Sequence, residues 1–429
     1  MEKLNEDFII NLSNNKGEPL WMKNFRLNSY KKFLELDNPS FGPKINIDFD
    51  NLVYHKGLFA PPSCSWENVD KKVKNTFNDL GVIEAENKYL KGVSNQYESE
   101  VIYHKMEESD GIIFLSTDEA LKKYPVLFEK YFNNLVKYDE NKYTALNGAL
   151  WSGGSFIYIP PYTKVDRPLQ SYFRIDTKNL GQFERTIIIV DHDSSLHYIE
   201  GCTAKNYSTT SLHAGVVEIY VGKNSTCKYS TIQNWSKDVY NLVTKRAILE
   251  EGAYMQWVDG NIGSGVTMKY PSCILKGDNS KASSISIAYA KEGQHLDAGA
   301  KMIHLGKNTK STIISKSIAG FGGTSDYRGT VKIAKEATGS FATIKCDNII
   351  LDNISSSNTY PKNIVENNES TLEHEATISK INEEKLNYLM SLGISEDAAK
   401  DLYVLGFMSD FKKSLPMEYA VELNRLIKE

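Results

Sequence analysis

Between about residues 150 and 365 the sequence is a succession of short β-type segments with almost no helical pattern. Branched or alternating stretches such as RTIIIV (185–190), VVEIYV (216–221) and GTVKIA (329–334) are separated by Gly, Asn, Asp and Ser. Many short strands of similar spacing allow a sandwich, a barrel or a stacked solenoid. Asn-Gly and Asp-Gly hairpin turns are rare in this region, which favours the solenoid.

The flanking regions have a different pattern. Residues 1–145 mix irregular stretches with apolar residues at helical spacing, and Ser116 offers a helix N-cap. The segment 381–429 reads as helical, with Ser395 capping one helix and Pro416 opening the last. We therefore predict a mostly helical N-terminal region (1–145), a β core (146–380) and a helical C-terminal region (381–429).

Charge and cysteine content exclude several classes of protein. A formal net charge of -4 gives no overall attraction for nucleic acid or an anionic membrane, and no apolar run approaches the length of a membrane-spanning helix. Five cysteines without a C-x-x-C pair argue against a disulfide framework or a zinc finger. The N-terminus lacks the pattern of a signal or transit peptide. We expect reduced thiols in the cytoplasm, or in an organelle stroma for a plastid-encoded chain.

No motif for ATP hydrolysis or for hydrolytic catalysis is present. The stretch GKNTKST (306–312) lacks the leading glycine of a nucleotide-binding loop, and neither H-E-x-x-H nor G-x-S-x-G occurs. If ATP drives this protein, another subunit must hydrolyse it. The reactive candidates are therefore the isolated cysteines and the Glu-His-Glu group at positions 373–375.

The stretch TLEHEATISK (371–380) gathers two carboxylates around a histidine. In a strand, Glu373 and Glu375 would share one face, about 6.5–7 Å apart, while His374 would point to the other face. Cys346 precedes His374 by 28 positions, a separation compatible with one solenoid turn, so these groups could be neighbours at about 4.8 Å. Thiolate, imidazole and carboxylate together favour iron, zinc or iron–sulfur chemistry. A solvated charged strand and a buried packing cysteine are the ordinary alternatives.

A second thiol, Cys202, follows Gly201 near the end of a predicted strand. It is either a packing residue or, exposed at a turn, a nucleophile whose thiolate is stabilised by neighbours. A rival interpretation from another class is a β-helical carbohydrate-active enzyme with Glu373 and Glu375 as its acid/base pair.

Several long, co-linear strings resemble the SufB/SufD family of the SUF iron–sulfur cluster assembly system, and its SufB-type scaffold subunits rather than its SufD-type ones. The strings are GEPLWMKNFR, SYFRIDTKNLGQFERT, YIEGCTA, YSTIQNW, VTKRA, KMIHLGKNTKSTIISKSI and LEHEATISKI. The resemblance implies a right-handed parallel β-helix core, a helical N-terminal region, and C-terminal helices that dock the ABC-type ATPase SufC. It also implies pairing with a SufD paralogue or with a second SufB copy.

The resemblance further implies roles for individual residues. Cys202 receives sulfur from a donor of the SufE or SufU type that works with a cysteine desulfurase, and an iron–sulfur cluster forms transiently and passes to apo-proteins. The sulfur-route residues are Arg174, Gln233, Trp235 and Lys245. The cluster-site residues are Cys346 and Glu375 first, then His374, then Glu373, with Cys346, Glu375 and His374 as metal ligands.

Some points stay open at the level of the sequence. Complexes of this family can bind flavin, which makes reduced FAD a candidate cofactor. A SufD-like structural subunit with inert thiols is the nearest alternative function. Two positions depart from the family pattern, since Asp176 replaces a common asparagine and Ile248 a common cysteine.

Overall fold

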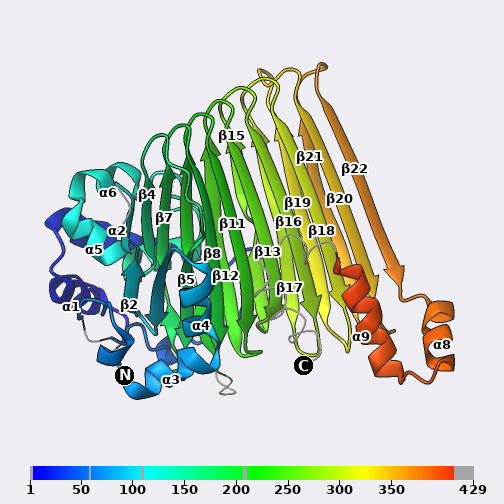
Figure 1. Ribbon diagram of the computed structural model, residues 1–429, viewed down its shortest axis with the longest axis horizontal. Coiled ribbons are helices and arrows are strands. Elements are labelled where there is room, and N and C mark those ends of the chain that lie inside the picture. The colour runs from blue at the N-terminus through cyan, green and yellow to red at the C-terminus, as the bar shows by residue number, and fades with distance from the viewer. Residues whose placement is uncertain (1–2, 58, 108–110, 206–209, 410–429) are drawn as a thin grey trace.

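The computed structural model describes residues 3–57, 59–107, 111–205 and 210–409, and its centre is a parallel β-solenoid (Figure 1). Within these residues two sheets of ten and twelve strands face each other, and the chain alternates between them from one turn to the next. The strand pairs of the solenoid are parallel, and antiparallel pairs occur at the N-terminal end. The predicted β-helix is therefore confirmed.

The ten-stranded sheet contains, in spatial order, β2 (Glu100–Met106), β1 (Gly92–Tyr97), β5 (Leu169–Ile175), β8 (Ser195–Ala204), β11 (Thr226–Trp235), β13 (Tyr254–Gly263), β16 (Lys281–Ala290), β18 (Lys310–Ala319), β20 (Phe341–Ile350) and β22 (Thr371–Lys380). The main path of the twelve-stranded sheet contains β21 (Ser356–Val365), β19 (Thr324–Ile333), β17 (His295–His304), β14 (Val266–Lys269), β12 (Val239–Leu249), β10 (Val216–Val221), β7 (Arg185–Val190), β4 (Ser155–Ile159) and β3 (Ile113–Ser116). Three short strands complete it: β15 (Ser272–Leu275), β9 (Ser211–His213) and β6 (Gly181–Gln182).

The turns between strands repeat with the coil. Asp193, Asn224, Asn279 and Asn308 all have left-handed backbone conformations, with φ between 54° and 60°. Asn and Asp adopt this conformation more readily than other residues with a side chain. The side-chain amide of Asn224 also donates to the carboxylate of Asp193, at 3.2 Å, which joins neighbouring coils. These Asn and Asp residues, which separate strand segments in the sequence, thus lie at corners of the solenoid.

The two sheets enclose a packed lumen, half of which is apolar. Leu196, Tyr229 and Trp257 from the ten-stranded sheet pack there against Ile219 and Met302 from the other sheet. These side chains come from alternate positions of each strand, because successive residues of a strand point to opposite faces. Burial of this cluster holds the coils together.

The N-terminal region is a mixture of helices and strands. Its helices are α1 (Glu6–Lys16), α2 (Leu20–Glu35), α3 (Lys71–Asp79), α4 (Val82–Tyr89), α5 (Thr117–Lys123), α6 (Pro125–Tyr131) and α7 (Lys142–Leu150), with short 3₁₀ turns at Phe49–Asn51 and Trp66–Asn68. Ser116 caps α5 by accepting from the backbone of Glu119, as predicted. The region also gives β1, β2 and β3 to the two sheets. Our division at residues 145 and 380 stays a prediction.

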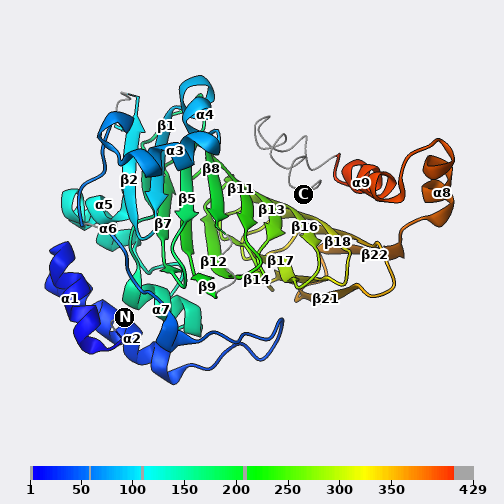
Figure 2. The same cartoon turned by 90° about the horizontal axis from the view of Figure 1, so that it is seen from below.

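These helices cover the outside of the solenoid at its N-terminal end (Figure 2). On the twelve-stranded sheet, Phe128 and Trp151 pack against Phe156 and Ile187. On the ten-stranded sheet, Phe77 of α3 packs near Tyr172. The outer faces of the first coils are therefore buried.

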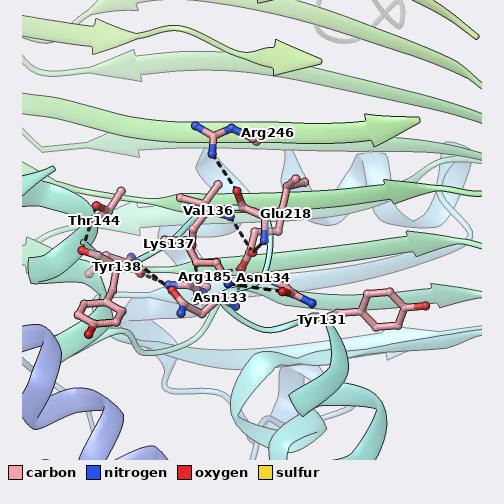
Figure 3. A network of polar contacts seen from close by, with 12 residues as sticks. Tyr131, Asn133, Asn134, Val136, Lys137, Tyr138, Thr144, Arg185, Glu218 and Arg246 are labelled. Carbon is pink, nitrogen blue, oxygen red and sulfur yellow. Dashed lines mark hydrogen bonds and ion pairs between the residues drawn. The ribbon is translucent and has the colours of Figure 1, made fainter. Parts of the chain in front are cut away.

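A buried carboxylate fixes the loop between α6 and α7 to the twelve-stranded sheet (Figure 3). Glu218 accepts backbone hydrogen bonds from Asn133, Leu135 and Val136 at 2.7–3.0 Å and pairs with Arg185 at 2.8 Å. The charge of Glu218 is compensated by a cation and several amides, which a buried carboxylate requires.

The solenoid ends at β21 and β22, and two helices follow. They are α8 (Glu383–Ser391) and α9 (Glu396–Phe407), and Ser395 caps α9 as predicted. The helices belong to an apolar cluster with the outer face of the ten-stranded sheet, which includes Ile287 and Ile318. The helix predicted from Pro416 lies outside the described residues. In the described part of the chain, every helix is too short or too polar to cross a bilayer.

Candidate functional site

A column of polar side chains runs along the lumen beside its apolar half. Its members lie opposite one another in the strand register and all point inward: Glu200, Thr231, Asp259, Ser286, Ser315 and Cys346. We call this set the polar column, and every member is buried. Five strand spacings separate its two ends, which corresponds to about 24 Å. The column connects the surroundings of Cys202 with Cys346.

Cys202 lies inside strand β8 and its thiol faces the lumen. It is only 1% exposed and lies between Phe173 of β5 and Gln233 of β11 in the register. Its thiol donates to Oε1 of Glu200 at 3.8 Å. The sequence allowed an exposed thiol at a turn, and this alternative is wrong, because the strand continues through Ala204.

The electrostatic environment keeps Cys202 protonated in the isolated chain. Burial raises the pKa of its thiol well above the ordinary value, and the negative charges of Glu200 and Glu184 raise it further. Lys245 and Lys269 oppose this effect without reversing it. A reactive thiolate at this position therefore requires a partner that takes the proton.

Glu200 is the centre of a fully buried hydrogen-bonded group. It accepts from Nζ of Lys245 at 3.0 Å and from the hydroxyl of Tyr229. Lys245 also lies over the ring of Tyr229, 4.5 Å from its centroid. Burial alone would raise the pKa of Glu200, but Lys245 and Tyr229 bring it below the ordinary value. Glu200 and Lys245 thus form a charged pair beside the thiol.

A second buried ion pair lies farther along the polar column. Nζ of Lys269 donates to Asp259 at 3.0 Å and to Gln233 at 3.1 Å. Gln233 also accepts from the side chain of Asn241 at 2.8 Å. Burial lowers the pKa of Lys269, although the nearby Asp259 raises it. The predicted route residue Gln233 therefore joins Cys202 to this second pair.

Trp235 and His213 lie side by side in the same part of the lumen. Their rings are 4.6 Å apart, and His213 pairs with Glu184 at 2.7 Å. Two buried donor atoms here, Nε1 of Trp235 and Nε2 of Gln233, have no hydrogen-bond partner among the described residues. Buried donors without a hydrogen-bond partner are rare, so these two donors favour the binding of a polar or anionic ligand in this stretch of the lumen.

Arg174 is separated from this group. It lies opposite Thr203 in the register, so it points to the outer face of the sheet while Cys202 points inward. Its guanidinium pairs with Asp176 at 2.9 Å and donates to Thr203 at 3.1 Å. The structure therefore brings together Cys202, Gln233, Trp235 and Lys245, but not Arg174. The unusual Asp176 is the ion-pair partner of Arg174.

Cys346 lies at the far end of the polar column, on strand β20. It shares the inward face with Ala342 and Ile344, as the sequence predicted, and all three are buried. Burial raises the pKa of the Cys346 thiol to about 12, although the Tyr327 hydroxyl beside it lowers this pKa. Cys346, like Cys202, is therefore a neutral thiol in the isolated chain.

The Glu-His-Glu group lies on the final strand, β22, next to β20. His374 is opposite Ile344 in the register and shares the inward face of Cys346. Nδ1 of His374 is 3.1 Å from the amide of Asn363, while its buried Nε2 has no hydrogen-bond partner among the described residues. Burial lowers the pKa of His374, which favours the neutral imidazole that binds metals. The chemistry of His374 and Cys346 fits an iron–sulfur centre.

Glu373 and Glu375 point to the other face of β22. Glu375 is opposite Lys345, at 3.8 Å between charged atoms, and both glutamates are exposed. The structure confirms the predicted alternation of the strand and shows that Cys346 shares the face of His374. Among the residues described, no three His, Cys, Asp or Glu side chains converge as a metal site.

Sequence reasoning missed the charged residues that surround Cys202. They are Glu184, Glu200, His213, Asp259 and Lys269. Glu200 had a usable signal, because it precedes Cys202 by two positions in a strand and must share its face. The other four come from different coils, and only the register brings them together.

Two family models together cover most of the chain. Residues 173–407 match the family described as SUF system FeS cluster assembly, SufBD core domain. Residues 68–171 match the SufBD protein N-terminal region. The boundary between the two matches falls in β5, where the stacked coils begin.

Known proteins of similar sequence carry corresponding names. The chain is 53% identical to the iron–sulfur cluster assembly protein SufB of Bacillus subtilis, over 99% of this chain and 92% of that protein. It is 54% identical, with the same coverage, to iron–sulfur cluster assembly SufBD family proteins of Staphylococcus saprophyticus and Staphylococcus aureus. These similarities favour cluster assembly over carbohydrate hydrolysis by Glu373 and Glu375. Fold, family models and relatives agree that the chain belongs to the SufBD family of SUF-system iron–sulfur cluster assembly proteins.

Proposed function

We propose that this chain is a non-catalytic scaffold that accepts sulfur at Cys202 and builds an iron–sulfur cluster at the C-terminal end of the solenoid. The observation that carries the proposal is the polar column, which leads from Glu200, next to Cys202, to Cys346. A sulfur source at one end and a cluster site at the other explain why a solenoid lumen contains so many buried polar groups.

The distance between the two thiols sets the requirements of the route. About 24 Å is far too long for direct exchange between Cys202 and Cys346, so sulfur must travel as a bound species. Lys245 and Lys269 each offset negative charge in the lumen, which suits a hydrosulfide or persulfide anion. Gln233 and Trp235 each offer a donor that has no partner in the part of the chain that the structure describes, along the first part of this path.

At the receiving end, Cys346, His374 and Glu375 are our proposed ligands. Strands β21 and β22 end the two sheets, and among the described residues no further strand pairs with their outer edges, so another chain can pair there. A SufD-type paralogue or a second copy of this chain would bring further ligands to that edge. The alternative, a SufD-like structural subunit, predicts that these residues are dispensable.

Other partners follow from the same proposal. The exposed apolar residues of the C-terminal helices, Tyr388, Leu392 and Leu402, offer a docking surface for a SufC-type ATPase.

A SufE- or SufU-type donor with a cysteine desulfurase would supply sulfur, and apo-proteins would receive the cluster. Reduced FAD stays our candidate cofactor, and the cytoplasm our proposed compartment.

The test compares Cys202→Ser with Cys227→Ser, which removes a buried lumen thiol of the apolar half. Each full-length variant is incubated anaerobically with iron, the sulfur donor system and the partner subunits, and iron and acid-labile sulfide are measured. We expect Cys202→Ser to lose the cluster and Cys227→Ser to retain it. Equal cluster content in wild type and Cys202→Ser would instead favour the structural-subunit alternative.

A further inference from the structure

The charges beside Cys202 are balanced in a way that limits how its thiol can ionise. One cation, Lys245, faces one anion, Glu200, and both side chains are buried. If the thiol lost its proton to bulk solvent, two anions would share that cation in a medium of low dielectric constant. If the proton moved to Glu200 instead, the site would keep one anion and one cation.

We propose that Glu200 is the proton acceptor for Cys202 during sulfur transfer, and that Lys245 then pairs with the Cys202 thiolate. This inference rests on the proposed function of Cys202 as the sulfur entry point. Its geometric basis is the contact of 3.8 Å between the thiol and Oε1 of Glu200, the same oxygen that accepts from Lys245. The atom that would receive the proton therefore already touches both partners.

The transfer step balances without a further reactant. The donor is a cysteine persulfide of a protein, and the thiolate of Cys202 attacks its terminal sulfur. The sulfur–sulfur bond of the donor breaks while a new sulfur–sulfur bond forms on Cys202. The donor leaves as a thiolate, which takes up one proton, and Glu200 holds the proton that Cys202 released. Cys202 is oxidised to a persulfide and the donor cysteine is reduced.

Other charged groups near the thiol are less suitable acceptors. The negative charge of Glu184 raises the pKa of Cys202, but Glu184 is hydrogen-bonded to His213 at 2.7 Å. Lys269, on the twelve-stranded sheet, pairs with Asp259. Glu200 itself faces Lys245, Tyr229 and His213, of which Tyr229 donates to its second oxygen. Glu200 combines direct contact with the thiol and a cation that can change partner.

Two explanations of Glu200 predict opposite effects of Glu200→Gln. If Glu200 only repels the thiolate, its neutralisation frees Lys245 and makes Cys202 more reactive. If Glu200 takes the proton, neutralisation removes the acceptor, and sulfur uptake slows at neutral pH. In that second case hydroxide replaces the missing base, so the deficit shrinks in alkaline buffer.

The experiment measures persulfide formation on Cys202 by mass spectrometry in the full-length chain, with free cysteine persulfide as the probe. The variants are Glu200→Gln, Glu200→Asp and the matched control Glu86→Gln, which neutralises a buried carboxylate on α4, outside the polar column. We expect Glu200→Gln to slow uptake on the order of 10²-fold at neutral pH, with partial recovery in Glu200→Asp. Glu86→Gln should change the rate much less, and circular dichroism checks folding of each variant.

Three results would overturn the inference. One is uptake by Glu200→Gln as fast as or faster than wild type at neutral pH. Another is an equal loss in Glu86→Gln, which would indicate a general effect of neutralising a buried carboxylate. The third is a deficit of Glu200→Gln that does not shrink at alkaline pH. Absence of any uptake at Cys202 in wild type is a different failure, because it removes the proposed entry point itself.

Discussion

Cys346 and Glu375 lie on opposite faces of the last two strands of the ten-stranded sheet. Cys346 is opposite Ala376 and points into the lumen, whereas Glu375 is opposite Lys345 and points outward. His374 shares the face of the thiol. A cluster that uses both Cys346 and Glu375 therefore requires the Glu375 side chain to pass the outer edge of β22, which has no neighbouring strand among the described residues.

This relationship gives our first prediction, on cluster ligands. We expect Cys346→Ala to abolish cluster assembly, because it removes the proposed thiolate ligand, and His374→Ala and Glu375→Ala each to reduce it. The double variant of His374 and Glu375 should match Cys346→Ala. Glu373→Ala is the matched control and should resemble wild type. Iron, sulfide and visible absorption after anaerobic reconstitution with partners measure the effect, and a loss confined to Glu373→Ala would contradict the assignment.

The second prediction concerns the buried ion pair of Asp259 and Lys269. Removing one partner leaves an uncompensated charge, so Lys269→Met should lower the free energy of unfolding by about 3–5 kcal/mol. The double replacement Asp259→Asn with Lys269→Met should recover much of this loss. Urea unfolding followed by circular dichroism provides the comparison. Additive losses in the double variant would show that the two charges do not depend on each other.

The third prediction concerns acid stability. Burial lowers the pKa of His304 from 6.5 to about 4, so its protonation opposes the folded state. The stability that depends on neutral His304 is complete above pH 6.5 and is lost as the pH falls through about 4. We expect His304→Gln to show a weaker decrease in melting temperature over this interval than wild type. Identical curves for His304→Gln and wild type would count against a role for His304.

The fourth prediction concerns the proposed docking surface for the ATPase. Truncation after Lys380 is a poor test, because loss of α8 and α9 would uncover apolar residues such as Ile287 and Ile318 and promote aggregation. Tyr388→Ser combined with Leu402→Glu should instead weaken ATPase binding in a pull-down while the core stays folded. Val126→Ser on α6, which is 83% exposed, is the matched control. If the double variant binds the ATPase as strongly as wild type, the ATPase docks on another surface.

The architecture of the core was predictable because its signals are local. Branched residues at alternate positions recur along the core, Asn or Asp marks several of the corners, and neighbouring coils pair in the same register. The same local alternation placed Glu373 and Glu375 on one face and Cys346 in phase with Ile344. The N-caps Ser116 and Ser395 could also be predicted from the sequence, since a helix cap depends on only about four neighbouring residues.

The chemistry of the lumen was less predictable because it depends on register across coils. The resemblance placed Arg174 on the sulfur route with Cys202, but the strand turns Arg174 to the outer face. It also allowed Cys202 to be exposed, whereas the thiol is enclosed. The contacts of Glu200 with Lys245 and of Lys269 with Asp259 join different strands, and no local pattern reveals them.

The constant strand spacing has a consequence for how such a chain can vary. Each coil adds about 4.8 Å to the polar column, so the number of coils between β8 and β20 sets the distance between Cys202 and Cys346. Insertions in the corner loops leave this distance unchanged, whereas the gain or loss of a whole coil changes it by about 4.8 Å. Variation in loop length is thus compatible with a conserved path length, and variation in coil number is not.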